Sequence, residues 1–260
     1  MTSGWGRRLA ASAAVLVLIG LAACGKSSDS SSSKTTTTTA TTTAKTGAAD
    51  ARTAAQLAAD TSLAKAANLT AADLPAGWSV ASSSSSSKGS SSQDKVNQAQ
   101  LAACLGVDAS ALNDTKVDES SPSFDKADAE VSSEVEVRPD EVTATKELAL
   151  IHNSRLPSCF STMFKQEFEK QATSGDTPGL KIGAVTVKAL AFPSIGDDVR
   201  ALRIEAPATY QGVTIDTFID IVVIRTGRTV VSMTYDNVQS PFDASVAEQA
   251  ARAVVGRAKA

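Results

Sequence analysis

The sequence predicts an α+β fold, in which an antiparallel sheet of about five strands has helices packed on one face and is held by one disulfide. Four runs rich in β-branched residues follow one another between residues 183 and 236, and a glycine lies between each run and the next. This spacing is typical of consecutive hairpins. Helical patterns precede and follow the runs instead of alternating with them, which favours an antiparallel sheet over a parallel one.

The strands are predicted from apolar alternation and from turn residues. In the first strand, Val135 and Val137 alternate with polar residues. A tight turn at Thr226-Gly227 separates the last two β-branched runs, as expected for a hairpin. The five predicted strands span Ala129–Arg138, Gly183–Phe192, Asp198–Tyr210, Thr214–Arg225 and Arg228–Asp236.

Apolar residues at spacings of three and four predict the helices. A short helix is expected to hold Leu101 and Cys104 on its buried side, and two further helices are expected to begin at Pro139 and Pro157. The final helix is predicted to follow an N-cap at Ser240. Its apolar face would contain Ala247, Ala250, Ala251, Val254 and Val255.

The N-terminal segment has the pattern of an export signal. Met1–Leu9 carries two arginines and no acid, and Ala10–Ala23 is apolar apart from one serine. An apolar run of about 14 residues is too short to span a bilayer as a helix. The following LAAC, Leu21–Cys24, resembles a bacterial lipobox, which implies a diacylglycerol on Cys24 and removal of residues 1–23. An uncleaved anchor and an ordinary signal peptide with a chance cysteine are the alternatives, and Arg7-Arg8 leaves twin-arginine export open.

The chain after the signal divides into a tether and a folded part. Residues 25–50 contain no apolar side chain larger than alanine, so they cannot bury enough surface to fold. We expect a lipidated cysteine and a disordered Ser/Thr/Ala-rich tether over residues 24–67, with the threonine runs either glycosylated or plain spacer. Residues 68–260 are predicted to form a single globular α+β domain, which a mobile serine-rich loop at 82–92 interrupts.

The remaining cysteines predict a disulfide. If Cys24 is lipidated, only Cys104 and Cys159 are left, and an even remainder in an exported chain favours a bridge. Two buried free thiols are the alternative. A structural metal site would need more ligands than these two thiols and His152, the only histidine, so no metal site is expected.

The charge of the chain restricts its partners. Without residues 1–23 the chain keeps 23 basic and 28 acidic residues, a net charge of −5. An acidic body argues against nucleic acid as a partner and against a polybasic grip on anionic lipid. We therefore expect attachment through acyl chains, such as palmitate, on Cys24, at the outer face of the cytoplasmic membrane. No cofactor is expected.

No catalytic residues are expected. The sequence contains no G-x-S-x-G elbow, H-E-x-x-H pair, Walker loop or G-x-G-x-x-G turn, so we predict that the chain is not an enzyme. His152 ends a helical pattern, which favours a capping or surface role. Trp78 and Tyr210 are interpreted as core residues, and stacking on a sugar or lining an apolar pocket is the alternative.

Charged residues on two predicted strands form the best candidate for an acidic site. Asp216 and Asp220 lie four apart on one strand and therefore share a face, as do Arg203 and Glu205 on the preceding strand. We interpret them as a solvated polar face with cross-strand pairs. A functional acid pair or a cation site remains the alternative.

Several short motifs carry a family resemblance. The lipobox, the tether, DLPAGW at Asp73–Trp78, the late meander and SPFD at Ser240–Asp243 resemble small actinobacterial lipoproteins. The body is similar to PknH-type extracellular sensor-like domains and to LpqN-type lipoproteins. This resemblance implies a sensor-like envelope module that binds a ligand or partner. A lipid or glycolipid carrier with an internal apolar cavity is the alternative, followed by a hydrolase with an acidic site.

Overall fold

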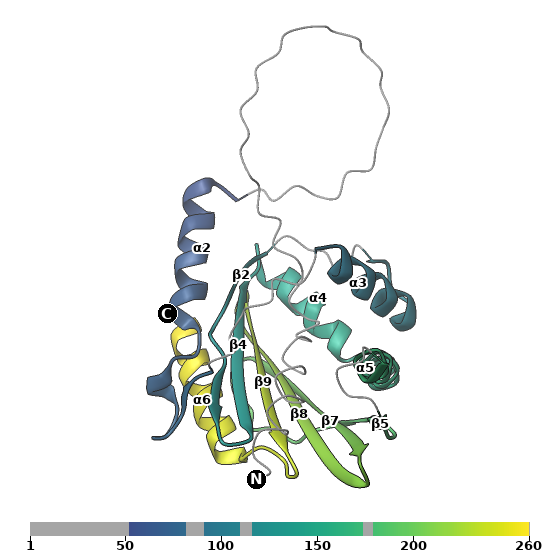
Figure 1. The fold of residues 1–260 in the computed structure, drawn as a ribbon. Helices are drawn as coiled ribbons and strands as arrows, with labels where there is room; N and C mark the ends of the chain where they lie inside the picture. The colour runs from purple at the N-terminus through teal and green to yellow at the C-terminus, as the bar shows by residue number, and fades with distance from the viewer. Residues whose placement is uncertain (1–51, 82–90, 110–115, 174–178, 260) are drawn as a thin grey trace, which may run out of the picture.

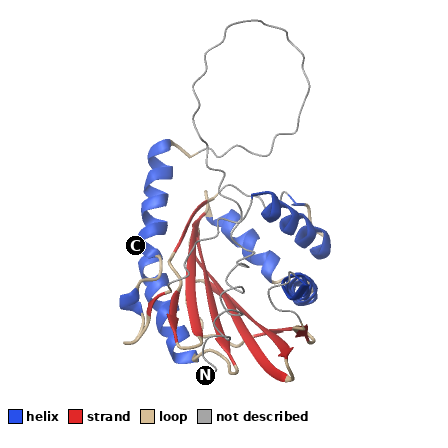
Figure 2. Cartoon of the chain, viewed as in Figure 1, coloured by secondary structure: helices blue, strands red, loops and turns tan. Residues whose placement is uncertain are grey.

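The computed structural model describes residues 52–81, 91–109, 116–173 and 179–259. Their elements form one antiparallel sheet with helices on both of its faces (Figures 1 and 2). The predicted signal peptide, Cys24 and residues 25–50 of the predicted tether lie outside the described residues, as does most of the serine-rich loop.

The described sheet has nine strands in the order β1-β3-β4-β9-β8-β7-β5, with β2 paired to β4 and β6 paired to β7. The long hairpin of β7 and β8 pairs without a break from Asp198↔Arg225 to Tyr210↔Val213. The strands are β1 (Ser79–Val80), β2 (Val117–Ser120), β3 (Phe124–Lys126), β4 (Ala129–Val137), β5 (Lys181–Ile182), β6 (Thr186–Ala189), β7 (Asp198–Tyr210), β8 (Val213–Thr226) and β9 (Thr229–Val238).

Two-residue turns join the three longest strands. Gln211 and Gly212, between β7 and β8, both have positive φ (50° and 81°), the pairing that a type I′ turn requires. Gly227 lies in the next turn with φ 55°. The glycine positions thus fix the ends of β7, β8 and β9 close to the predicted boundaries.

The predicted fold class is wrong in two respects, because the sheet has nine strands instead of five and carries helices on both faces. Val222 and Ile224 of β8 face one cluster of buried side chains, whereas Ile221 and Val223 face another. A continuous apolar run of this kind indicates a strand that is buried on both sides. The prediction also overlooked β1, β2, β3 and β5, which are four residues long or shorter.

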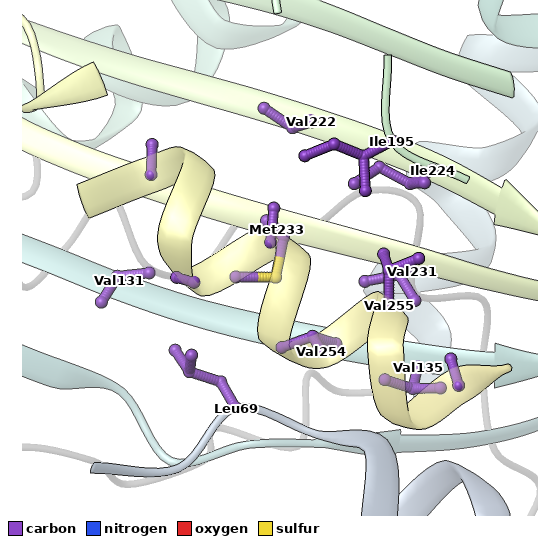
Figure 3. Close-up of a cluster of buried hydrophobic side chains, with 14 of the residues drawn as sticks. Leu69, Val131, Val135, Ile195, Val222, Ile224, Val231, Met233, Val254 and Val255 are labelled. Carbon is purple, nitrogen blue, oxygen red and sulfur yellow. The ribbon is translucent and has the colours of Figure 1, made fainter. Parts of the chain in front are cut away.

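Helices α2 (Ala54–Ala67) and α6 (Ala244–Ala258) cover the first face, together with the short 3-10 helix η1 (Ala71–Asp73). Figure 3 shows Val254 and Val255 of α6 among the buried side chains Val131, Val135, Val231 and Met233 of β4 and β9. The buried face of α6 contains the five residues predicted for it and Ala258. Its N-cap is Asp243 instead of Ser240, because the Asp243 side chain accepts hydrogen bonds from the Ser245 and Val246 amides.

Helix α2 lies in a segment that the sequence assigned to the tether, as a helix with little to pack at most. It is capped by Thr53 and packs against β2, β4 and α6. Asp60, only 2% exposed, accepts hydrogen bonds from Arg52 and Arg228 and so joins the helix to the sheet. The packed part of the chain therefore begins before residue 68.

Helices α3 (Ser91–Leu105), α4 (Glu141–Ile151) and α5 (Leu156–Thr173) cover the second face. The predicted disulfide is present and joins α3 to α5, with 5.8 Å between the Cα atoms of Cys104 and Cys159. Cys159 is fully buried but Cys104 is exposed, so its predicted position on the buried side of α3 is wrong. That side carries Leu101, Ala102 and Leu105. No helix among the described residues is long and apolar enough to cross a membrane.

Candidate functional site

The most unusual feature of the second sheet face is a concentration of polar side chains on β2, β4 and β9. Val131, Val135 and Val137 of β4 point to the α2 and α6 side, so the alternate residues of this strand point to the other side. We call the resulting polar surface the carboxylate face. It comprises Asp118, Ser120, Glu130, Ser132, Glu134, Glu136, Ser232, Thr234 and Asp236, and is bordered by Lys116, Arg138 and Glu147.

The strand register sets these side chains in rows. Across the β4–β9 ladder, Glu130 lies opposite Asp236, Ser132 opposite Thr234, and Glu134 opposite Ser232. Successive rows are two residues apart along each strand, which corresponds to about 6.6 Å. The carboxylate face is therefore a ladder of oxygen-bearing side chains that follows the strand direction.

One end of the carboxylate face is a buried ion network around Glu136. Arg138 Nη2 lies 2.7 Å from Glu136 Oε2, and Arg138 Nε donates to Glu147 Oε2 of α4, also at 2.7 Å. Lys116 Nζ contacts Glu136 Oε1 and lies 3.5 Å from Glu134 Oε1. This network ties α4 to the sheet, and two cations serve three carboxyl groups.

The pKa values differ because the carboxyl groups share these cations unequally. Burial and the nearby Glu136 charge raise the pKa of Glu134 to about 8. The same two causes raise the pKa of Glu147 to about 7. Burial opposes the ionisation of Glu136 too, but Lys116 and Arg138 hold its pKa below the usual value. Glu136 is thus the ionised centre, and its two neighbours take up protons near neutral pH.

Two other rows of the carboxylate face contain oxygen atoms that have no hydrogen-bond partner among the described residues. Asp236 is 4% exposed and its Oδ1 has no partner, and Ser232 is 3% exposed with an unpartnered Oγ. Burial, followed by the Glu130 and Asp220 charges, raises the pKa of Asp236 well above its usual value. Leaving a buried polar group unpaired costs about 1–3 kcal/mol. These atoms can therefore accept donors from a ligand.

The carboxylate face is strongly acidic. Among the described residues it brings six carboxyl groups together with the two cations Lys116 and Arg138: Asp118, Glu130, Glu134, Glu136, Glu147 and Asp236. No group of three or more His, Cys, Asp or Glu residues in the described part of the chain converges well enough to hold a metal ion. The carboxylate face therefore suits a cation whose hydrogen-bond donors are spaced along its length.

The acidic site that the sequence suggested is divided in the structure. Arg203 and Asp220 do pair across β7 and β8, through two hydrogen bonds of 2.6 Å, on the face that α2 and α6 cover. The pair is not solvated as expected, because Asp220 is only 5% exposed. Glu205 instead pairs with Lys188 at 2.9 Å, and Asp216 lies about 13 Å along β8 from Asp220. The four residues thus do not form an acid pair.

The remaining candidates have roles in packing or at the surface. His152 is the C-cap residue of α4, and its Nε2 lies 3.5 Å from Asp198 Oδ2 at the protein surface. The Trp78 ring lies 5.7 Å from the Phe242 ring and packs against the core, as interpreted from the sequence. Tyr210, at the end of β7, is partly buried.

Sequence reasoning missed the carboxylate face although two signals were present. Glu134 and Glu136 alternate with valines, a pattern that normally indicates a strand with one face in water. Ser232, Thr234 and Asp236 show the same alternation on a strand that was also predicted. Only the β4–β9 register brings the two polar sets together, and neither strand reveals this register by itself.

Comparison with known proteins gives little further information. No protein-family model matches the chain, and no curated protein is similar to it in sequence. Among solved structures, a weak neighbour is the extracellular domain of PknH from Mycobacterium tuberculosis, with a TM-score of 0.28 and 12% identity. The match covers 53% of this chain and 63% of that one, so the chain spans less than two thirds of the neighbour's length.

Proposed function

We propose that this protein is a membrane-anchored extracytoplasmic lipoprotein whose folded domain is a sensor-like module that binds a ligand or partner. The observation that carries the proposal is LAAC at Leu21–Cys24, directly after a basic and an apolar segment. Lipidation of Cys24 would place the domain on a tether at the outer face of the cytoplasmic membrane. Two acyl chains give stable attachment, whereas one alone is marginal.

The disulfide supports export of the folded domain. Disulfides persist in oxidising compartments and are rare in the cytosol. Cys104 is exposed on α3, so cytosolic reductants would have access to the bond. A structural role for this bridge therefore fits a domain outside the cytoplasmic membrane.

Binding, as opposed to catalysis, is the activity we assign. The sequence carries none of the common catalytic motifs. The carboxylate face, in contrast, offers buried oxygen atoms to which no group in the described part of the chain donates a hydrogen bond. A module that recognises a ligand through this face accounts for both observations.

The anchor is tested by replacing Cys24 in the full chain, produced in a bacterium that processes lipoproteins. Wild-type protein is expected in the membrane fraction and should incorporate an alkyne-labelled palmitate, whereas Cys24→Ala protein should lose the label. The Cys104→Ala/Cys159→Ala double variant is the matched control, because it removes two cysteines and should keep the label. Label on the Cys24→Ala protein, or an unlabelled wild type, would contradict the proposal.

A further inference from the structure

The ligand of the carboxylate face can be inferred from the part that the ion network leaves unused. At one end of the carboxylate face, Lys116 and Arg138 neutralise the charge of Glu136. The row of Glu130 and Asp236 has no cation in any ion pair of the described residues, and it contains the unpartnered Asp236 Oδ1. In the row of Glu134 and Ser232, Lys116 donates to Glu134 at 3.5 Å, and Ser232 Oγ has no hydrogen-bond partner among the described residues.

We propose that these rows bind a linear polyamine, an organic cation whose ammonium groups are spaced along a flexible chain. The assignment rests on the proposed function as a binding module and specifies its ligand class. One ammonium group would lie between Glu130 and Asp236, and a second near Glu134 and Ser232. The alkyl chain between them would cross the row of Ser132 and Thr234.

Spacing favours a linear cation over a single ion. Asp236 and Ser232 are four positions apart on β9, which separates them by about 13 Å along the strand. A calcium ion gathers its oxygen ligands at about 2.3–2.6 Å, so one ion cannot reach both rows. A polyamine with three ammonium groups has donors spread over a length comparable to the distance between the row of Asp236 and the row of Ser232.

Charge and access agree with this ligand. The carboxylate face has six carboxyl groups and only two cations, so carboxyl groups that hold protons can ionise when a further cation binds beside them. Hydrogen bonds between an ammonium group and a carboxylate are stronger than neutral ones. Glu130, Ser132 and Thr234 are only partly buried, so a flexible chain can approach the row of Ser132 and Thr234 from solvent.

Binding should also release protons. Asp236 and Glu134 hold protons more tightly than ordinary carboxyl groups, because burial disfavours their charged forms. An ammonium group in contact with each would favour the carboxylate. The heat of binding should therefore depend on the ionisation enthalpy of the buffer, a readout that nonspecific attraction to surface acids would not give.

The test is isothermal titration calorimetry of the full-length protein in a non-ionic detergent, with spermidine as the probe. We expect one spermidine to bind per chain and protons to be released. The affinity for n-butylamine, which offers one ammonium group, should be lower than the affinity for spermidine by roughly tenfold or more. Asp236→Asn should weaken spermidine binding roughly tenfold and reduce the number of protons released. Asp216→Asn is the matched control, because Asp216 is an exposed acid of β8 outside the carboxylate face.

A second variant covers the case in which Asp236→Asn fails to fold. Glu130→Gln changes a partly buried side chain in the same row and should weaken binding without unfolding the domain. The inference is overturned if spermidine does not bind, if n-butylamine binds equally well, if both variants bind like wild type, or if calcium binds one-to-one and displaces spermidine. Lipidation of Cys24 with no spermidine binding would refute this inference alone, whereas binding by an unlipidated protein would refute only the anchor.

Discussion

Loss of the Cys104–Cys159 bond should lower the free energy of unfolding by about 4 kcal/mol. The bond joins residues 55 positions apart, and closing a loop of this length in the unfolded chain has an entropic cost of about 4 kcal/mol at 25 °C. The loop includes the residues of β2, β3, β4 and α4, so the bond restrains this whole segment in the unfolded chain. Most of the native packing around Cys159 should survive reduction.

Urea denaturation measures this difference. The wild-type protein is compared with and without dithiothreitol, and the Cys104→Ala/Cys159→Ala variant is treated in the same way. Reduction should destabilise the wild type by about 4 kcal/mol and leave the double variant unchanged, because only the wild type has a bond to lose. A wild-type loss below about 1 kcal/mol would refute the reasoning, since it would show that the bond hardly restrains the unfolded chain.

Two further predictions concern a turn and the ion network. Gly196→Ala should lower the free energy of unfolding by about 2 kcal/mol or more, because φ is +76° and a new Cβ would lie 2.5 Å from the Arg225 carbonyl oxygen. Gly212→Ala is the control, because φ is +81° there but the space around a new Cβ is open. Urea denaturation should show a clearly smaller loss of stability for Gly212→Ala than for Gly196→Ala. Stability should fall as pH rises from about 4.5 to 8, because the folded-state pKa values of Glu134 and Glu147 are raised to about 8 and 7, so the folded chain binds more protons in this window. Each carboxyl contributes a slope of up to about 1.4 kcal/mol per pH unit, so Glu147→Gln should make the slope shallower by the share of that one group, and an unchanged slope in that variant would contradict the assignment.

Much of the fold could be predicted because it is encoded locally. Glycines in the turns set the ends of the long strands, since few other residues adopt positive φ. The apolar stripe of α6 was also visible from residue spacing alone. In contrast, β1 and β5 contain two residues each, and their existence depends on pairing with strands distant in the sequence.

Helix α2 shows why composition misled the prediction. Its buried residues are Asp60, Ala64 and Ala67, none of which indicates a packed face in the sequence. Alanines allow the helix to lie close to the sheet, and Asp60 is buried because Arg228, 168 positions away, neutralises it. Neither effect can be seen in a local window.

The candidate site depends even more on tertiary structure. The pairing of Arg203 with Asp220 could be predicted, because the two strands are joined by a short hairpin. The carboxylate face could not, since Lys116, Glu136 and Glu147 come from three separate segments. Alternating acids on a strand normally indicate contact with water, and only these distant partners allow the acids to be buried.

The most direct test of the lipoprotein assignment is the intact mass of the full-length protein, extracted in detergent from the membranes of the cell that makes it. The account predicts a single chain that begins at Cys24, carries a diacylglycerol on that residue, and is two hydrogens lighter than the reduced form because of the Cys104–Cys159 bond. A chain that begins elsewhere, or one without lipid on Cys24, would contradict the central claim.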